Sequence, residues 1–458
     1  MNKLNKTLRK ITTGLRLMLV LGCLIAPMVS AQHPAAASTV LGPIAYVRPN
    51  SITGDEIHLI EADGTNDRIL WETGVSRPAE LVDIQQLTWK PDASELAFTS
   101  SHEADCSLYQ SDVYALRSDG QEYRRVSGPP ACGNPDGLPT GTVHVPVENG
   151  SYDESGPFTI YFEGAPGPIE IALAPYQSTV LTFTNVADFG IKNQSAVAIY
   201  GDARSFYPDA KVDVQPGQTV ETGVLVISTG FEHYGFQWPS YRLDGTKIAS
   251  IFNKSELYQV DSENRVPGVL GSILPVTMPV SSDFLTWGPT ATRADQFLYE
   301  GWQDSDTIFL GNASTGSSQL IMTIDPLRIG KSLLGLAWLP DGSGFLYSVS
   351  EMVNYVDKAD LFVYSFATKQ STRLTNLSYG FIRRITVSPD AQMIAFEYQE
   401  YGYWYEENPV TDLYVIDLNE AQAYLLAENS RAPAWSPTDL PELIENDNFI
   451  FLPAVLKP

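Results

Sequence analysis

The sequence predicts an all-β protein: a six-bladed β-propeller with an immunoglobulin-like β-sandwich inserted between blades two and three. Three observations predict this fold. A strand–turn–strand unit recurs at nearly constant spacing, a strand that begins with an acid recurs with it, and one interval between units is about 100 residues too long. A period of roughly 40–50 residues with four short strands per unit is typical of a propeller blade.

The turn of the repeated unit is clearest in residues 336–350, LAWLPDGSGFLYSVS, where an apolar run ends at Trp338 and Pro340-Asp341-Gly342 follows. Proline presets φ, aspartate bonds to nearby backbone, and glycine closes the turn, so the unit is strand, tight turn, strand. The other copies are Trp89-Lys90-Pro91-Asp92-Ala93, Tyr241-Arg242-Leu243-Asp244-Gly245, Val387-Ser388-Pro389-Asp390-Ala391, a degenerate Trp287-Gly288-Pro289 and a truncated Trp435-Ser436-Pro437.

The spacing of these units sets the number of blades. From Tyr241 onward, the residues before the turns lie about 46 to 51 positions apart. Another repeated strand, which begins with an acid, occurs six times, and this number predicts six blades. The six copies are Glu56–Ile60, Asp112–Leu116, Glu256–Val260, Asp306–Leu310, Asp360–Tyr364 and Asp412–Ile416.

The two ends of the repeat region complement each other. The first blade lacks an inner strand and its turn, whereas residues 432–437 supply an inner strand with nothing after it. We therefore expect the ring to be closed by mixed chain ends, which leaves no free sheet edge. The propeller is expected over residues 42–128 (blade one in part, and blade two) and 236–437 (blades three to six and the closing strand).

The long interval, between Trp89 and Tyr241, predicts an inserted domain over residues 129–235. About seven short alternating runs in about 100 residues suit an immunoglobulin-like sandwich, here without its Cys–Trp–Cys core. These runs are Thr142–Glu148, Phe158–Phe162, Pro168–Leu173, Ser178–Thr184, Ala196–Tyr200, Lys211–Val214 and Thr219–Ser228.

The first 31 residues have the pattern of a secretory signal peptide: five basic residues, an apolar run, and small residues up to Ala31. We expect export to the periplasm, the cell surface or the medium, and an alternative is a lipoprotein anchored through Cys23. Residues 438–458 form a C-terminal tail that ends in an apolar stretch too short to span a membrane. This tail could pack on the propeller rim or serve in surface attachment or sorting, and the sequence leaves both alternatives open.

Net charge limits the possible partners, and the cysteine content predicts a disulfide. The formal net charge is −25, and removal of the leader makes it more negative, so nucleic acid and anionic membranes are unfavourable partners. Cys106 and Cys132 remain after processing. An even pair in an exported chain predicts a disulfide.

The repeated Trp-x-Pro-Asp-Gly turns and Asp-Leu-Tyr-Val-Ile strands resemble the TolB-type WD40-like β-propeller repeat, over residues 42–128 and 236–437. The resemblance implies a six-bladed propeller exported from the cytoplasm. Two departures matter: no α/β domain precedes the propeller, and the 129–235 insert is foreign to TolB. The TolB partner lipoprotein is therefore not carried over.

The residues that bear chemistry show little catalytic pattern. The turn aspartates fit a role in capping backbone N–H groups, and the strand-leading acids fit either a rim cation site or acids facing water. The sequence contains no Gly-x-Ser-x-Gly elbow after the propeller and no His-Glu-x-x-His pair, and its five histidines are scattered. We expect no metal and no cofactor.

The strongest recognition signal is residues 397–408, EYQEYGYWYEEN, where strand alternation gives way to aromatics and acids. Tyr401, Tyr403, Trp404 and Tyr405 are the candidate ligand-binding residues, because exposed Tyr and Trp give large contact area at low entropic cost. The alternative is a long hairpin whose aromatics cover a neighbouring blade.

These features predict a non-catalytic, exported, monomeric propeller that binds protein or glycan partners at the cell envelope or outside the cell. A rival hypothesis is a secreted hydrolase or lyase acting on polysaccharide or peptide at the propeller mouth. A third is a structural surface component attached through the sandwich and the tail.

Overall fold

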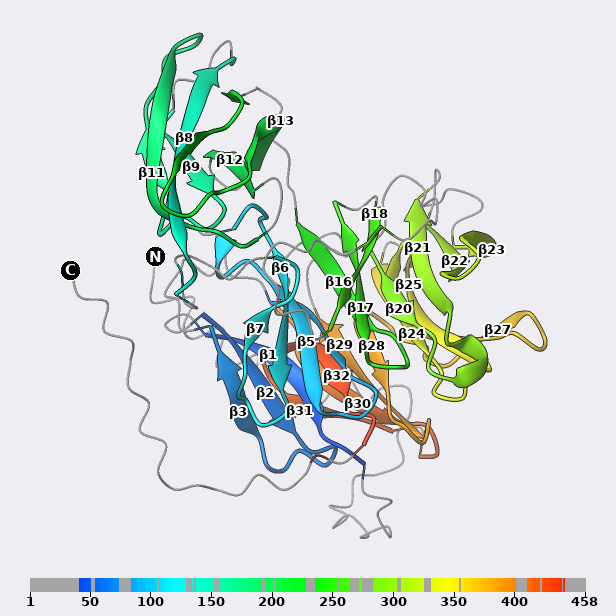
Figure 1. The fold of residues 1–458 in the computed structure, drawn as a ribbon. Coiled ribbons are helices and arrows are strands. Elements are labelled where there is room, and N and C mark those ends of the chain that lie inside the picture. The colour runs from blue at the N-terminus through cyan, green and yellow to red at the C-terminus, as the bar shows by residue number, and fades with distance from the viewer. Residues whose placement is uncertain are drawn as a thin grey trace, which may run out of the picture. The chain divides into compact units, whose positions relative to one another are not determined.

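A computed structural model provides the structure of this chain. It describes residues 41–50, 54–73, 84–104, 107–128, 134, 137–151, 156–190, 194–200, 203–227, 235–253, 256–262, 272–273, 283–302, 306–324, 331–353, 356–400, 410–420, 422–438 and 440. The expected signal peptide and nearly all of the expected tail lie outside these residues. Apart from the 3₁₀ turn η2 (Ala291–Arg293), the described elements are all strands (Figure 1). Over the same residues, no helix is long and apolar enough to cross a membrane.

Outside the segment between β7 and β16, four sheets contain four antiparallel strands each. The first is β3 (Arg68–Glu72), β2 (Gly54–Ile60), β1 (Ile44–Asn50) and β32 (Arg431–Trp435). The second is β4 (Gln85–Trp89), β5 (Glu95–Ser100), β6 (Asp112–Arg117) and β7 (Arg124–Arg125). The third is β16 (Phe236–Tyr241), β17 (Lys247–Phe252), β18 (Glu256–Asp261) and β19 (Ser272–Ile273). The fourth is β20 (Leu285–Trp287), β21 (Gln296–Trp302), β22 (Asp306–Asn312) and β23 (Ser317–Thr323).

A larger sheet joins two such groups. The first group is β24 (Leu333–Trp338), β25 (Gly344–Val353), β26 (Val356–Ser365) and β27 (Gln370–Arg373). The second group is β28 (Gly380–Val387), β29 (Met393–Gln399), β30 (Asp412–Asp417) and β31 (Gln422–Ala427). They meet where β26 pairs in parallel with β28, at Lys358↔Gly380 and Ala359↔Phe381.

The first and last strands of the described chain share one sheet. β1 pairs antiparallel with β32, at Ile44↔Trp435 and Ala45↔Ala434. Trp435 also joins Ile44 and Tyr46 in one buried apolar cluster. This pairing covers one edge of β1 with backbone hydrogen bonds, which protects that edge from pairing with another chain.

Six strands form a cycle of contacts. β4, β16, β20, β24, β28 and β32 each contact the next, and β32 contacts β4. Tryptophans that end these strands bind the neighbouring sheet: the Trp89 indole donates to the Ala434 carbonyl at 3.0 Å, and the Trp338 indole to the Thr286 carbonyl at 3.0 Å. These two tryptophans therefore link neighbouring sheets, and we call the six strands of the cycle the innermost strands.

The repeated turns are held by their aspartates. In each, the Asp Oδ1 accepts from the backbone N–H two residues later: Asp92 from Ser94, Asp244 from Thr246, Asp341 from Ser343 and Asp390 from Gln392. Hydrogen bonds to these carboxylates lower the pKa of Asp341. The interpretation of these acids as backbone caps is confirmed.

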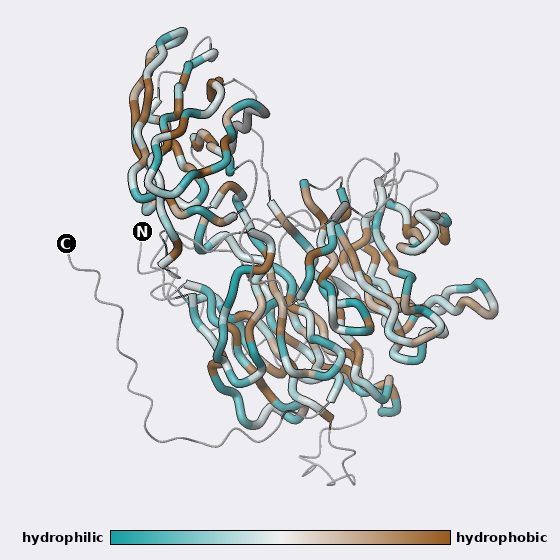
Figure 2. The backbone as a smooth tube through the Cα atoms, viewed as in Figure 1, coloured by the Kyte–Doolittle hydropathy of each residue, from teal (hydrophilic) through white to brown (hydrophobic). Residues whose placement is uncertain are grey.

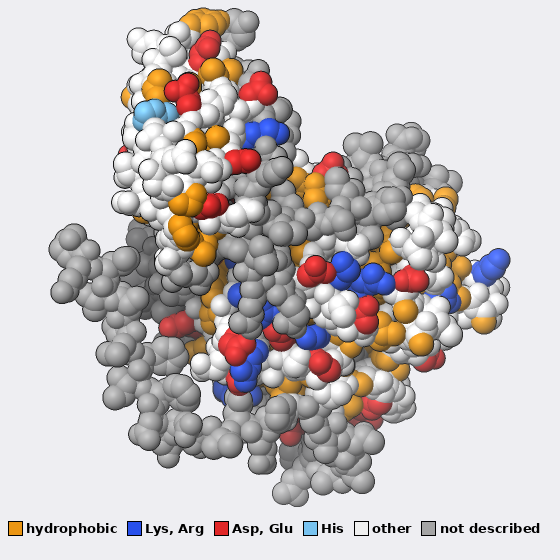
Figure 3. Space-filling view, viewed as in Figure 1, with side chains coloured by type: hydrophobic (Ala, Val, Ile, Leu, Met, Phe, Trp, Pro, Cys, Tyr) orange, Lys and Arg blue, Asp and Glu red, His pale blue; other side chains and the backbone are white. Residues whose placement is uncertain are grey.

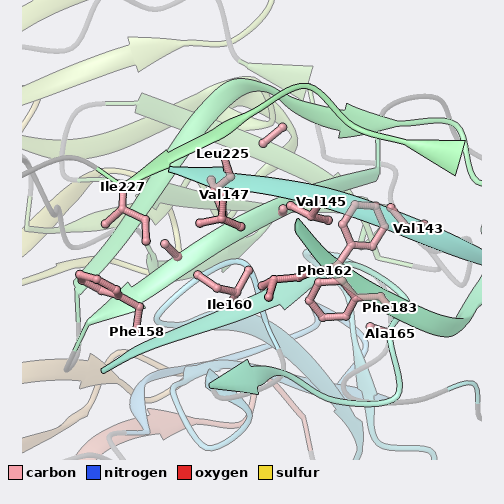
Figure 4. Packing of buried hydrophobic residues seen from close by; sticks show 14 of the residues in the cluster. Val143, Val145, Val147, Phe158, Ile160, Phe162, Ala165, Phe183, Leu225 and Ile227 are labelled. Atoms are coloured by element: carbon pink, nitrogen blue, oxygen red, sulfur yellow. The ribbon is translucent and has the colours of Figure 1, made fainter. Parts of the chain in front are cut away.

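Residues between β7 and β16 form a two-sheet unit. One sheet is β10 (Ile169–Ile171), β9 (Phe158–Phe162), β12 (Gln194–Tyr200) and β13 (Ala203–Val212). The other is β11 (Ser178–Ala187), β8 (Thr140–Asn149), β14 (Thr219–Glu221) and β15 (Leu225–Ile227), with β14 and β15 parallel to β8. Alternate side chains of β8, β9 and β11 point into one core (Figure 4). Hydrophobic residues recur along the strands, and many turns at the strand ends are hydrophilic (Figure 2).

Candidate functional site

The innermost strands share an irregularity near their N-terminal ends. Five of the six have one residue more than the paired stretch of the neighbouring strand, and β20 is the exception. The extra residues fall at Gln86, Trp238, Leu334, Arg384 and Ala432. Such a β-bulge bends the strand and re-aims a side chain, and bulges are frequent next to functional sites.

Four bulge residues have left-handed backbone conformation without being glycine. Their φ angles are 40° at Gln86, 55° at Trp238, 31° at Arg384 and 52° at Ala432. Each lies three residues before the residue that precedes the turn. A non-glycine residue in this region costs about 1–3 kcal/mol, and such strain concentrates at sites of function.

Two of these side chains meet. The guanidinium carbon of Arg384 lies 6.0 Å from the centre of the Trp238 ring. Another aromatic neighbour of this ring is Phe284, at 4.4 Å between ring centres. Because β28 and β16 stand three steps apart in the cycle of six, the pair joins opposite members of the cycle. We call this pair and the bulges around it the central cluster.

A buried carboxylate holds two of the bulges. The Glu397 side chain on β29 is 1% exposed and accepts a hydrogen bond from Arg384 Nη1 at 2.9 Å. The same Oε1 accepts from the backbone N–H of Ala432. Glu397 therefore fixes Arg384 and the β32 bulge together, and a charged acceptor makes both bonds stronger than neutral ones.

Gln86 contributes an unsatisfied acceptor. Its side-chain Oε1 is buried and has no hydrogen-bond partner within the described part of the chain. Leaving such an atom unsatisfied costs about 1–3 kcal/mol. Gln86 is thus strained in its backbone and unsatisfied in its side chain, and a ligand that donates a hydrogen bond would remove the second cost.

The innermost strands carry further polar side chains. Gln85, Gln237, Arg383 and Arg431 lie on the same innermost strands and are partly exposed. Arg431 pairs with Asp55, which also accepts from the backbone N–H of Ile84 at 2.8 Å. The cluster therefore combines an aromatic ring, guanidinium groups and amides on anchored backbone, which is a combination suited to recognition.

Of the six acids that begin the acid-led strands, Glu256 is exposed, as expected for an acid facing water, whereas the others are buried or half-buried. Glu56, Asp112 and Asp360 are buried. Three of the six bind the segment leading to the next innermost strand: Asp306 accepts from Leu333 N at 2.7 Å, Asp360 from Leu377 N at 2.7 Å, and Asp412 from Asn429 N at 2.8 Å. Their partners lie 17 to 27 residues further along the chain, beyond the next strand. Among the described residues, no group of three or more His, Cys, Asp or Glu could hold a metal.

Two of the described histidines are held by structural contacts. His58 lies between Asp67 at 3.0 Å and Glu56 at 3.0 Å, one at each ring nitrogen. His102 contacts Ser100 Oγ at 2.9 Å through Nδ1 and the Tyr123 hydroxyl at 2.7 Å through Nε2. Both are buried, which suits a structural role.

The residues selected from sequence all lie outside the described part of the chain: Tyr401, Tyr403, Trp404, Tyr405, Cys106 and Cys132. The strands that flank the aromatic stretch are described. β29 ends at Gln399, two residues after Glu397, and β30 begins at Asp412. The connection with the predicted ligand-binding residues thus leaves β29 beside the anchor of the central cluster.

Sequence reasoning missed Trp238, Arg384 and Gln86. A usable signal lies three positions before the residue that precedes each repeated turn. There, alternation is broken by Trp238 followed by proline, by two consecutive arginines ending at Arg384, and by Ala432 followed by proline.

No protein-family model matches the chain, and no curated protein matches it in sequence. Many solved structures do. TolB from Acinetobacter baumannii has 13% identity and a TM-score of 0.47, over 87% of this chain and 67% of that one. A putative 6-phosphogluconolactonase from Bacteroides uniformis has 11% identity and a TM-score of 0.40, over 85% and 98%. An oligogalacturonate lyase in complex with manganese has 12% identity and a TM-score of 0.36, over 84% and 85%. These likenesses concern fold alone, and the all-β chain fits a TolB-like β-propeller fold, as its repeats predicted.

Proposed function

We propose that this chain is an exported, non-catalytic binding module whose partner, a protein or a glycan of the cell envelope or its surroundings, is recognised at the central cluster. The observation that carries the proposal is the recurrence of strained bulges at one position of four innermost strands, two of which meet in the Trp238–Arg384 contact, together with the buried acceptor of Gln86. Strain repeated at one position in four strands needs a compensating role.

The architecture we propose is a six-bladed propeller closed by mixed chain ends, with an immunoglobulin-like sandwich between blades two and three. The cycle of innermost strands supports six blades, and the β1–β32 pairing supports the closure. The single core between the two sheets of residues 140–227 supports the sandwich. The domain limits 42–128, 129–235 and 236–437 belong to this proposal.

Export rests on the leader of residues 1–31, with cleavage after Ala31 or lipidation at Cys23. The surface is consistent with a soluble partner, because acidic and basic side chains are interspersed on the face shown in Figure 3. A net charge of −25 disfavours nucleic acid and anionic lipid. We expect the protein to be a monomer.

The rival function, a hydrolase or lyase, needs a group in the cluster that moves protons. The carboxylate in the best position, Glu397, is 1% exposed and bonded to Arg384 and to Ala432 N. These bonds hold the Glu397 side chain in a structural task. The cluster therefore favours binding over proton transfer.

The test is capture from envelope and culture-medium fractions by the mature protein, together with a glycan array. Three proteins are compared with wild type: Arg384→Gln, the double variant Tyr403→Ala/Trp404→Ala, and the control Arg117→Gln. Arg117 makes exposed ion pairs with Asp119 and Glu122 at the β6–β7 turn. This turn lies at the end of its sheet opposite to the β4 bulge.

We expect the first two variants to weaken binding on the order of tenfold, as loss of a central contact does, and the control to bind like wild type. A partner bound equally by all four proteins would place recognition elsewhere. Turnover of a captured polysaccharide or peptide by wild type would replace the binding function with the rival one.

A further inference from the structure

The two-sheet unit packs on the propeller-like sheets through an apolar contact. Tyr161 of β9 and Val197 and Ile199 of β12 belong to one buried cluster with residues of the second and third sheets, among them Val113 and Phe236. All three side chains of the unit are buried. We call this contact the joint.

A pair of opposite charges is buried beside the joint. Arg125 Nη1 lies 3.1 Å from Asp112 Oδ2, and the two side chains are 3% and 2% exposed. Ser107 Oγ and Ser127 Oγ also donate to Asp112, at 2.5 Å and 2.7 Å. The Asp112 carboxylate is thus satisfied by groups of its own sheet and needs no partner from the two-sheet unit.

The two-sheet unit adds a carboxyl group at the same place. Glu163, directly after β9, is 7% exposed, and its Oε2 accepts from the backbone N–H of Ser195 at 2.8 Å. Glu163 lines a small polar pocket together with residues of the second sheet. The other lining residues are Ser107, Leu108, Tyr109, Asp112, Arg125, Gly128 and Tyr161.

Among the described residues, the charges that face Glu163 do not balance. Arg125 on β7 is the cation that faces it, and Asp112 on β6 already pairs with that cation. Tyr109, on the connection before β6, and Tyr161, on β9, also face this carboxyl. Glu103, before the same connection, faces Arg125 as well. One guanidinium therefore meets three carboxyl groups in a place with little water.

We propose that the joint is operated by a proton on Glu163: it is closed while this carboxyl is neutral and loosens when the carboxyl ionises. Opening the joint brings Glu163 into water, where it ionises freely, and leaves Asp112 and Arg125 paired on their own sheet. Glu163 is thus the group of the joint that changes its charge with pH, and the Asp112–Arg125 ion pair stays intact.

The pKa values agree with this direction. Burial raises the pKa of Glu163 from 4.5 to about 7, and Asp112 adds to the rise, while Ser195 N–H and Arg125 oppose it. Burial also raises the pKa of Glu103. Because the closed joint binds the proton more tightly than the open one, its stability is greatest below the ordinary pKa and falls as pH rises to about 7.

The test is hydrogen exchange of the full chain at about pH 5.5 and about pH 8, corrected for the intrinsic chemical rate. The reporters are β9, β12 and residues 107–109. For wild type we expect the corrected exchange of these segments to be on the order of tenfold faster at the higher pH. In Glu163→Gln, which cannot ionise, the two rates should agree.

The matched control is Glu170→Gln, an exposed carboxyl on β10 of the same unit, which should behave like wild type. Equal exchange of wild type at the two pH values overturns the proposal, and so does an unchanged pH response in Glu163→Gln. Should Glu163→Gln fail to fold, isotope-edited infrared titration of the wild-type carboxyls decides. A buried carboxyl that protonates near pH 7 supports the proposal, and midpoints all near 4–5 refute it.

Discussion

The guanidinium carbon of Arg384 lies 6.0 Å from the ring centre of Trp238, although β28 and β16 stand on opposite sides of the cycle of innermost strands. In a regular strand, successive side chains point to opposite faces of the sheet. Both residues stand at bulges, with φ of 31° and 55°, and a bulge re-aims the side chain of its strand. A cation over an indole gains about 0.5–2 kcal/mol, which offsets only part of the strain of two left-handed residues.

If the strain at Gln86 serves binding, removing it should stabilise the protein and weaken binding. Gln86 has φ 40° and a buried acceptor without a described partner. Gln86→Gly is expected to gain up to about 1 kcal/mol in the free energy of unfolding and to weaken partner binding. Denaturant titration and a binding isotherm measure the two effects.

The control for this trade-off is Ala93→Gly in the repeated turn, where φ is 56°. It should bring a similar gain in stability because it relieves the same conformation, and leave binding unchanged. If Gln86→Gly and Ala93→Gly both bind the partner as wild type does, the β4 bulge has no role in binding.

Gly335 sets how closely β24 approaches the Arg384 backbone. A Cβ at this position would lie 2.9 Å from Ser348 Oγ and 3.2 Å from Arg384 N. The serine hydroxyl can rotate, but the backbone must shift by a few tenths of an ångström. Gly335→Ala should therefore cost about 1–2 kcal/mol in thermal or denaturant unfolding and weaken binding by displacing Arg384. Gly167→Ala, which meets no atom within 4 Å, is the control and should change neither.

The turns could be predicted from the sequence because their cause is local. Asp341 bonds to Ser343, two residues away, so the Pro-Asp-Gly pattern contains both donor and acceptor. The strand-leading acids were found, but not their partners: Asp306 bonds to Leu333, 27 positions away, and that distance depends on the arrangement of the sheets.

The central cluster could not be predicted because it opposes local preference. Gln86 and Arg384 have no tendency toward positive φ, so packing among the innermost strands imposes it. One extra residue per strand is also hidden by the variation in repeat length, from about 46 to 51 residues. The contact of Trp238 with Arg384 arises only when strands distant in sequence meet.

The pairing of Cys106 with Cys132 stays a prediction. Non-reduced peptide mapping of the exported protein should find the two cysteines joined, and reduction should lower stability by about 3 kcal/mol, since a loop of this length is closed. Alkylation of both thiols without prior reduction would contradict the pairing.

Glu397 is the residue on which the central cluster depends most. Glu397→Gln keeps an acceptor for Ala432 N but removes the charge that pairs with Arg384, whose side chain is 24% exposed. Breaking a fully buried pair costs about 3–5 kcal/mol, and the partial exposure of Arg384 lowers the expectation to about 2–3 kcal/mol. A double-mutant cycle with Arg384→Gln should give a coupling of about 1–2 kcal/mol, because the double variant has no uncompensated guanidinium. The control, Glu428→Gln, changes an exposed carboxylate near β31 and should stay within about 0.5 kcal/mol of wild type. If Glu397→Gln unfolds and binds like wild type, the bulges of β28 and β32 do not need this anchor, and the cluster loses its link to the aromatic connection that follows β29.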